Sequence, residues 1–184
     1  VLLRTPRGMS TSDLPDHVGD LIHAAPITNV YMVGRRGPMD AKFTNVELRE
    51  MGELTETVPQ MKFDQMPDSI EETVAILEGR ERRLKERNLN TLAKFVERSA
   101  DEKPKRVHFE FYAQPVEVLG GDRVEGVRFE RTAVNYGRAS GTGEIFDIDC
   151  GLVIAAIGYR ADPIKGAPYD EKQAIIPNDE GRVD

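Results

Sequence analysis

The feature that most constrains this chain is a short apolar run that ends in a glycine and two arginines. Residues 29–34 are mostly apolar, β-branched or aromatic, which predicts a buried strand. Arg35 and Arg36 follow directly, and Gly37 and Pro38 turn the chain. Open α/β sheets bind ligands at the carboxyl ends of their strands, so the two guanidiniums are expected at a ligand-binding edge.

Paired arginines at such an edge suit a phosphate monoester. The planar guanidinium makes two parallel, charge-assisted hydrogen bonds to a group of this kind. In a dinucleotide site the monoester is the 2′-phosphate of NADP(H), whereas NAD is usually met by an acidic residue. Arginines also follow strands at ordinary protein surfaces, so the dipeptide alone leaves both interpretations open.

Composition narrows the class of protein. Of the 184 residues, 39% are hydrophobic and 31% are charged, which is typical of one globular domain with a real core. No apolar run approaches the roughly 20 residues that a membrane-spanning helix needs. The net charge of −7 argues against nucleic-acid binding. The single cysteine, Cys150, excludes an internal disulfide and is expected to be a buried thiol. The three histidines lack ligand spacing, so no metal site is expected.

Helical periodicity predicts three helical regions. Apolar residues recur at spacings of three and four over residues 13–25. A second helix is expected from Thr44, which forms a capping box with Glu47. A third is expected from Ser69, again with a capping box; its charged continuation through residues 79–86 is either exposed or broken before the apolar positions resume.

From residue 106 the apolar period changes to two, which predicts strands. We expect an antiparallel insert over about residues 105–150, with a hairpin turn at Gly120-Gly121-Asp122. Residues 135–143, including Gly141-Thr142-Gly143, are predicted to form a loop. The continuous apolar run 152–158 predicts a parallel strand that is buried on both faces.

The two ends of the chain predict a piece of a longer protein. Residues 1–6 are typical of the last turn of a helix that is stopped by Pro6. The final residues, 178–184, are mostly polar and include no closing element.

The sequence resembles a known family at several motifs. The run from Val33 to Pro38, the pair Phe43-Thr44 and the run from Glu47 to Glu50 resemble the NADP domain of adrenodoxin-reductase-type ferredoxin–NADP reductases. Two later segments, residues 156–160 and 176–183, also resemble the same family. Their distance along the sequence from the first motifs matches the spacing in that family. The resemblance covers nearly the whole chain.

The resemblance implies a fold and an activity. It implies an α/β, Rossmann-like NADP-binding domain of the glutathione-reductase-like, two-dinucleotide-domain flavoprotein fold, with an inserted antiparallel β-meander. Residues 1–184 would be part of that domain, and the FAD-binding domain would lie outside this chain. The family carries hydride from NADPH to a bound FAD, then single electrons to a ferredoxin- or adrenodoxin-type iron–sulfur protein. The isolated chain is expected to bind no FAD and to be inactive.

The resemblance also assigns site residues. Arg35 and Arg36 match the pair that holds the 2′-phosphate, and Glu47 matches an acidic residue of the pyridine-nucleotide site. Glu47 is equally explained by its capping box, and both roles can hold at once. No catalytic residue is assigned. NADP(H) and FAD are the expected cofactors, with FAD bound by parts of the protein outside this chain.

A basic run predicts a partner surface. Ferredoxins are strongly acidic, so a reductase should present a basic patch. Arg80, Arg83 and Arg87 share one helical face and form a candidate docking stripe. A solvated helix face explains the same run. The expected compartment is the cytoplasm, or the mitochondrial matrix in a eukaryote.

The sequence is also compatible with three other functions. A glutamate-synthase small-subunit-like NADPH reductase shares the architecture. A relative of thioredoxin or glutathione reductase needs a redox-active cysteine pair, which this chain does not supply. A non-catalytic NADP-binding or interaction domain is the third.

Overall fold

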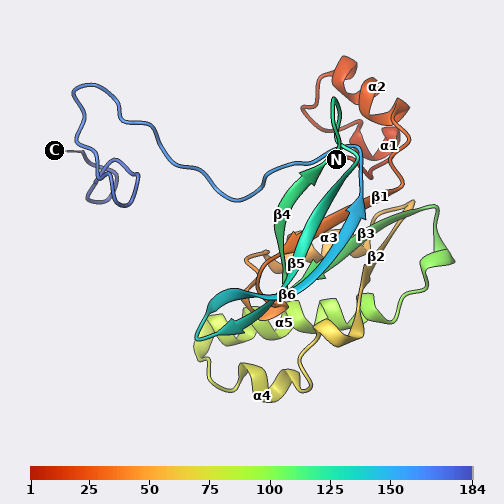
Figure 1. The fold of residues 1–184 in the computed structure, drawn as a ribbon, viewed down its shortest axis with the longest axis horizontal. Helices are drawn as coiled ribbons and strands as arrows, with labels where there is room; N and C mark the ends of the chain where they lie inside the picture. The colour runs from red at the N-terminus through yellow and green to blue at the C-terminus, as the bar shows by residue number, and fades with distance from the viewer. Residues whose placement is uncertain (184) are drawn as a thin grey trace. The chain divides into compact units, whose positions relative to one another are not determined.

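The computed structural model describes residues 1–183, which fall into two compact units (Figure 1). The first unit is Val1–Cys150 and the second is Gly151–Asp184. The first unit holds all the helices and strands described below.

A parallel sheet forms the centre of the first unit. Its strands are β1 (Asn29–Gly34), β2 (Thr57–Met61) and β3 (Lys105–Phe111), in the order β1-β3-β2. The strand predicted over residues 29–34 is confirmed, since β1 has these bounds.

The structure corrects the place where the antiparallel section begins. The alternation of Val107, Phe109 and Phe111 suggested the first strand of the antiparallel insert, but β3 is the central strand of the parallel sheet. These three side chains are buried against helices, while the residues between them face the other side of the sheet. Because β3 bears polar residues such as His108 on one face, its sequence alternates in the way that is typical of an antiparallel strand. The antiparallel sheet begins at Ala113.

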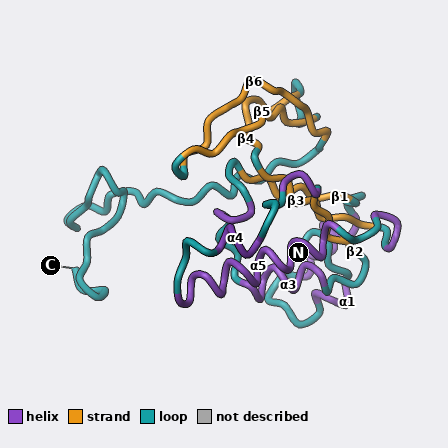
Figure 2. Tube along the Cα trace, turned by 90° about the horizontal axis from the view of Figure 1, so that it is seen from below, coloured by secondary structure: helices purple, strands orange, loops and turns teal. Residues whose placement is uncertain are grey.

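The described residues form five α-helices and three short 3₁₀ turns, of which α1 and α2 precede the first strand. They are α1 (Pro6–Met9), α2 (Asp16–Ala24), η1 (Pro38–Asp40), α3 (Asn45–Gly52), η2 (Phe63–Gln65), α4 (Ile70–Val74), α5 (Gly79–Val96) and η3 (Ala100–Glu102). In Figure 2, α3 and α5 lie on one side of the parallel strands, and the antiparallel sheet lies on the other.

Helices α2 and α3 lie where the sequence predicts helices. The start of α1 and the break between α4 and α5 differ from the prediction. Pro6 begins α1 instead of stopping a helix, because the Thr5 hydroxyl accepts a hydrogen bond from the Gly8 N–H at 3.0 Å and proline is well suited to the first helical position. The expected third helix is divided in two at residues 75–78. Gly79, with φ of +57°, redirects the chain into α5, whose charged first turns are continuous with the rest of the helix.

The main core lies between the parallel sheet and helices α3 and α5. Phe109 of β3 lies at its centre, with its ring 5.6 Å from that of Phe95 and 5.9 Å from that of Phe43. Leu48 of α3 and Leu92 of α5 are almost fully buried beside it. Burying each side chain of this kind stabilises the fold by about 1.5–3 kcal/mol. These contacts therefore hold helices α3 and α5 against the parallel sheet.

The predicted antiparallel insert is present, although it begins at Ala113 and not near residue 105. It consists of β4 (Ala113–Leu119), β5 (Gly126–Asn135) and β6 (Arg138–Asp149), in the order β4-β5-β6. The expected loop at 135–143 is wrong, because β5 and β6 pair up to a two-residue turn at Tyr136-Gly137. Both turn residues have positive φ, 50° and 73°, which matches the twist of a tight hairpin. Gly141-Thr142-Gly143 therefore lies within β6.

The expected strand at 152–158 is not formed. Residues 152–158 are exposed and pair with no strand in the described part of the chain. A buried parallel strand needs hydrogen-bonded neighbours and cover on both faces, and the second unit provides neither for this run. Within that unit, Ala174 is buried and Asp170 pairs with Ile175.

Two further findings concern burial. Cys150 is half-buried instead of buried, and it packs at the margin of the small cluster formed by Ala113, Val127 and Phe129. Within the described residues, no helix is long and apolar enough to cross a membrane.

Candidate functional site

The two arginines lie at the carboxyl end of β1, as the sequence predicts. Arg35 is exposed, and its guanidinium has no hydrogen-bond or ion-pair partner within the described residues. The Arg36 side chain is 36% exposed and its Nη1 lies 3.3 Å from Oδ1 of Asp40. We call residues 35–40 the arginine turn. It presents one unpaired cation and one cation that a carboxylate holds in place.

The backbone of the arginine turn is held by residues far away in the sequence. The Thr132 hydroxyl donates to the carbonyl oxygen of Arg35 at 2.7 Å. The Tyr112 N–H donates to the carbonyl oxygen of Arg36 at 3.4 Å. At Gly37 a β-carbon would lie 2.2 Å from the Tyr112 hydroxyl oxygen, so the position needs glycine for this close approach.

Helix α5 supports the segment that follows the turn. Lys85 donates from Nζ to the carbonyl oxygen of Ala41 at 2.8 Å, and Asn88 donates from Nδ2 to that of Phe43 at 2.9 Å. Burial lowers the pKa of Lys85, and the charges of Arg36 and Lys42 lower it further, against the carboxylates of Asp40 and Glu81. Arg36, Lys42 and Lys85 therefore share one neighbourhood with the carboxylates of Asp40 and Glu81.

Glu47 begins α3 and completes the predicted capping box. Its Oε2 accepts hydrogen bonds from the Thr44 N–H at 2.9 Å and from the Thr44 hydroxyl at 2.8 Å, and the Thr44 hydroxyl oxygen accepts from the Glu47 N–H at 3.2 Å. The hydrogen bond from the Thr44 N–H is the main reason that the pKa of Glu47 is lowered. Among the described hydrogen bonds and ion pairs, none joins Glu47 to Arg35 or Arg36.

The capping role of Glu47 leads to a prediction. Glu47→Gln is expected to keep the melting temperature of the chain, because glutamine also accepts the cap N–H, whereas Glu47→Ala lowers it. Circular dichroism melting curves of the two variants measure the difference. Equal melting temperatures for the glutamine and alanine variants would contradict a stabilising cap.

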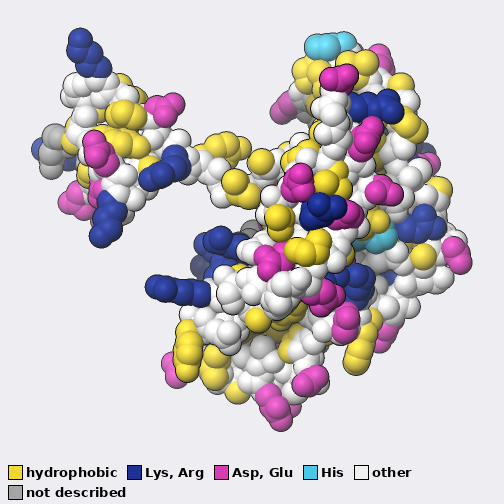
Figure 3. All heavy atoms as spheres, viewed as in Figure 1, with side chains coloured by type: hydrophobic (Ala, Val, Ile, Leu, Met, Phe, Trp, Pro, Cys, Tyr) yellow, Lys and Arg dark blue, Asp and Glu magenta, His cyan; other side chains and the backbone are white. Residues whose placement is uncertain are grey.

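The predicted basic stripe is exposed. Arg80, Arg83 and Arg87 lie on α5 opposite the face that buries Leu89 and Leu92. Acidic and basic side chains are interspersed over the face drawn in Figure 3.

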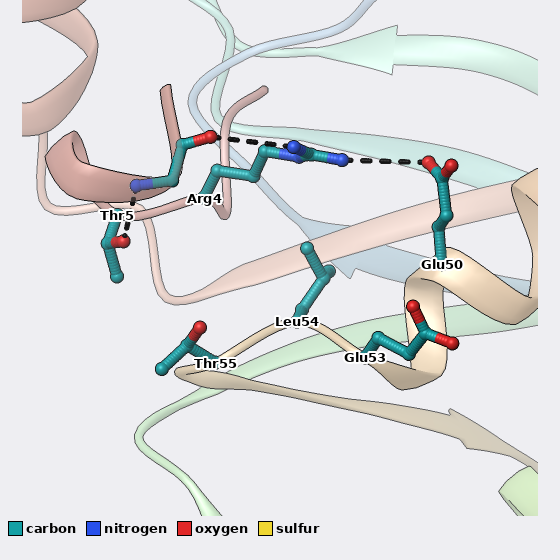
Figure 4. Close-up of a pocket in the computed structure, with 7 residues that line it drawn as sticks. Arg4, Thr5, Glu50, Glu53, Leu54 and Thr55 are labelled. Atoms are coloured by element: carbon teal, nitrogen blue, oxygen red, sulfur yellow. Dashed lines mark hydrogen bonds and ion pairs between the residues drawn. The ribbon is translucent and has the colours of Figure 1, made fainter. Parts of the chain in front are cut away.

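Two clefts lie elsewhere in the first unit. One, of about 220 Å³, lies between the chain start and the end of α3, where Arg4 pairs with Glu50 at 3.6 Å (Figure 4). The other lies between α3 and α5. Neither cleft is lined by Arg35, Arg36 or Glu47. The arginine in the first cleft is paired with a carboxylate, as Arg36 is, whereas the Arg35 guanidinium has no partner among the described residues.

The sequence missed three residues of this site. Asp40, Lys85 and Thr132 all contact the arginine turn or the segment after it. Only Asp40 left a signal, as an acidic residue four positions after Arg36. Within the described residues, no group of three His, Cys, Asp or Glu side chains is placed to hold a metal ion.

Known proteins are similar to this chain over its whole length. The mitochondrial NADPH:adrenodoxin oxidoreductase of Arabidopsis thaliana is 32% identical, over 100% of this chain and 40% of the relative. That of Salvelinus fontinalis is 36% identical, over 95% and 37%. The NADPH-ferredoxin reductase FprA of Mycobacterium tuberculosis is 32% identical, over 100% and 40%. The chain is homologous to part of the adrenodoxin-reductase-type NADPH reductases.

Solved structures of these reductases give the same result. FprA of Mycobacterium tuberculosis in complex with NADPH matches with a TM-score of 0.87 at 30% identity, over 99% of this chain and 40% of FprA. A mutant of FprA matches with a TM-score of 0.88. The predicted similarity to part of these reductases and the α/β fold class are confirmed. No family model matches the chain. The chain spans about 40% of the length of the reductases it matches.

Proposed function

We propose that this chain supplies the NADP 2′-phosphate site of a flavoprotein oxidoreductase. The enzyme passes electrons from NADPH through FAD to a ferredoxin- or adrenodoxin-type iron–sulfur protein. The observation that carries the proposal is the exposed, unpaired Arg35 guanidinium at the carboxyl end of a parallel strand. It is supported by the similarity to FprA, a reductase whose structure was solved with NADPH.

The arginine turn has the geometry to select NADPH. The Arg35 fork is available to the phosphate without displacing another anion, and Asp40 holds Arg36 through Nη1 while its other N–H groups remain available. Each charged hydrogen bond contributes about 1.5–3 kcal/mol. NADH lacks the phosphate and gains none of this energy, so the two arginines separate the two nucleotides.

The proposal is tested by the Kd values of NADPH and NADH for this chain, followed through nicotinamide fluorescence. We expect NADPH to bind at least tenfold more tightly, as one charged hydrogen bond alone would give. Equal Kd values would contradict the assignment of Arg35 and Arg36.

Glu47 is proposed as a second nucleotide contact. Its carboxylate is exposed at the start of α3, and only Oε2 is used by the cap. The Glu47→Gln variant separates the two roles, because it keeps the cap and removes the charge. Weaker NADPH binding at an unchanged melting temperature supports the contact, and unchanged binding removes it.

The described residues do not fit FAD. A flavin pyrophosphate is bound at a glycine-rich turn that opens a helix. Gly141 and Gly143 lie within β6, so this pattern does not form such a turn. We propose that FAD is bound by the part of the enzyme outside this chain and that the chain alone is inactive. A purified chain that is yellow and reduces ferricyanide with NADPH would contradict this.

The stripe formed by Arg80, Arg83 and Arg87 is proposed as a docking surface for the acidic iron–sulfur partner. Arg83→Glu is expected to slow association with an acidic ferredoxin about tenfold at low salt, because the stripe attracts the partner before contact. Arg123→Glu, at the exposed turn between β4 and β5, makes the same charge change elsewhere. If the stopped-flow association rates fall equally in both variants, the effect is due to net charge, and the stripe is not the docking surface.

The names of the relatives support a proposal for the compartment. The adrenodoxin oxidoreductases are named as mitochondrial. We propose the mitochondrial matrix if the source is eukaryotic and the cytoplasm otherwise.

A further inference from the structure

The arginine turn is joined to the antiparallel sheet through one buried threonine. Thr132 lies in β5 and is 6% exposed. Its hydroxyl donates to the carbonyl oxygen of Arg35 at 2.7 Å, and its N–H donates to the carbonyl oxygen of Tyr112 at 2.9 Å. Tyr112 in turn contacts the turn through the carbonyl oxygen of Arg36. Two consecutive carbonyl groups of the arginine turn are thus held, that of Arg35 by Thr132 of β5 and that of Arg36 by Tyr112, which connects β3 to β4.

The residue before Thr132 fixes β5 on the parallel sheet. The Arg131 guanidinium donates to the carboxylate of Glu110, whose side chain is 6% exposed. Gln65 donates to the same carboxylate at 2.8 Å. The Arg131 guanidinium also lies 4.0 Å from the centre of the Phe146 ring. With Arg131 held in this way, Thr132 has a fixed place beside the turn.

We propose that Thr132 is a positioning residue for NADPH selection, acting through the carbonyl group of Arg35. This inference rests on the proposed function of the arginine turn. The Arg35 side chain has no partner among the described residues, so the position of its backbone is what the fold fixes, and Thr132 holds that backbone. A fixed backbone lowers the entropy cost of bringing the guanidinium to a phosphate.

The test uses the ratio of two dissociation constants for this chain, that of 5′-AMP divided by that of 2′-phospho-AMP. Thr132→Val keeps the shape of the side chain and removes the donor. We expect the ratio to fall about 3- to 10-fold, as the loss of one hydrogen bond would give. Thr132→Ser keeps the hydroxyl and should restore the ratio.

A matched control is available in the same chain. Thr57 is fully buried and its hydroxyl donates to the carbonyl oxygen of Leu3 at 3.1 Å. It begins β2, which is separated from β1 and the arginine turn by β3. Thr57→Val removes a similar bond and should leave the ratio unchanged. A ratio in Thr132→Val equal to that of the unmodified chain would overturn the inference.

Two further results separate this inference from the function on which it rests. If Arg35→Ala/Arg36→Ala leaves the ratio unchanged, the proposed function itself fails. If that variant abolishes the preference and Thr132→Val does not change it, only the positioning role fails. In the unmodified chain, the amide resonances of Tyr112 and Thr132 should shift with 2′-phospho-AMP and not with 5′-AMP. This measurement needs no variant to fold, and unshifted resonances would count against the role of Thr132.

Discussion

Replacing Arg131 by methionine is expected to lower the free energy of unfolding by about 3 kcal/mol. The change leaves the Glu110 carboxylate buried without its main cation, which costs about 3–5 kcal/mol in proteins. The lower end applies here because Lys62 remains 3.2 Å from the carboxylate and Gln65 remains hydrogen-bonded to it. Urea unfolding followed by circular dichroism measures the difference.

The matched control is an arginine of the same sheet that is paired at the surface. Arg128 binds Asp147 through two hydrogen bonds of 3.0 Å and lies 3.2 Å from Glu117. Because exposed pairs contribute little, Arg128→Met should leave the unfolding midpoint nearly unchanged. If Arg131→Met destabilises the chain no more than Arg128→Met does, the buried pair is not what joins the two sheets.

The same pair sets a pH dependence. Burial raises the pKa of Glu110, but the hydrogen bonds from Arg131, Gln65 and Lys62 outweigh burial and leave this pKa below its ordinary value. The pair therefore stabilises the fold fully above the unfolded pKa, about 4.3, and the stabilisation is lost as pH falls through the lower, folded pKa. In Arg131→Met the folded pKa of Glu110 rises toward or past the unfolded value, so the stability that is lost on acidification should shrink or change sign.

The second large effect is expected at the arginine turn. Arg35→Ala/Arg36→Ala should reduce the preference for NADPH over NADH about 100-fold or more, since two charged hydrogen bonds of about 1.5–3 kcal/mol each are lost. Dissociation constants for both nucleotides measure the change. Arg123→Ala/Arg138→Ala removes two exposed arginines of the antiparallel sheet and should leave the preference intact. A similar loss in both double variants would point to net charge and not to the arginine turn.

The parts of the fold that the sequence predicted correctly are those with a strong local signal. The strand before Arg35, the capping box of Thr44 and Glu47 and the hairpin around Gly120-Gly121 are each specified by a few adjacent residues. Strand β3 was misassigned because alternation reports one buried face, and does not report whether the neighbouring strands are parallel. The run 152–158 was misassigned because an apolar sequence does not reveal whether its partners lie in the same chain.

The residues of the candidate site also differ in whether they leave a local signal in the sequence. Arg35 and Arg36 are recognisable because they are adjacent and follow a strand. Thr132 lies 97 positions from Arg35, and a single hydroxyl that donates to a distant carbonyl leaves no pattern in the sequence. Lys85 was hidden in a charged run, where only the packing of α5 shows that it turns toward the segment after the arginine turn.

Calorimetric titration of the chain with 2′-phospho-AMP and with 5′-AMP tests the central claim most directly. The two ligands differ only in the phosphate that Arg35 and Arg36 are proposed to bind. We expect 2′-phospho-AMP to bind more tightly than 5′-AMP, and we expect the difference to disappear in Arg35→Ala/Arg36→Ala. Failure of 2′-phospho-AMP to bind, or equal affinity for both ligands, would contradict it.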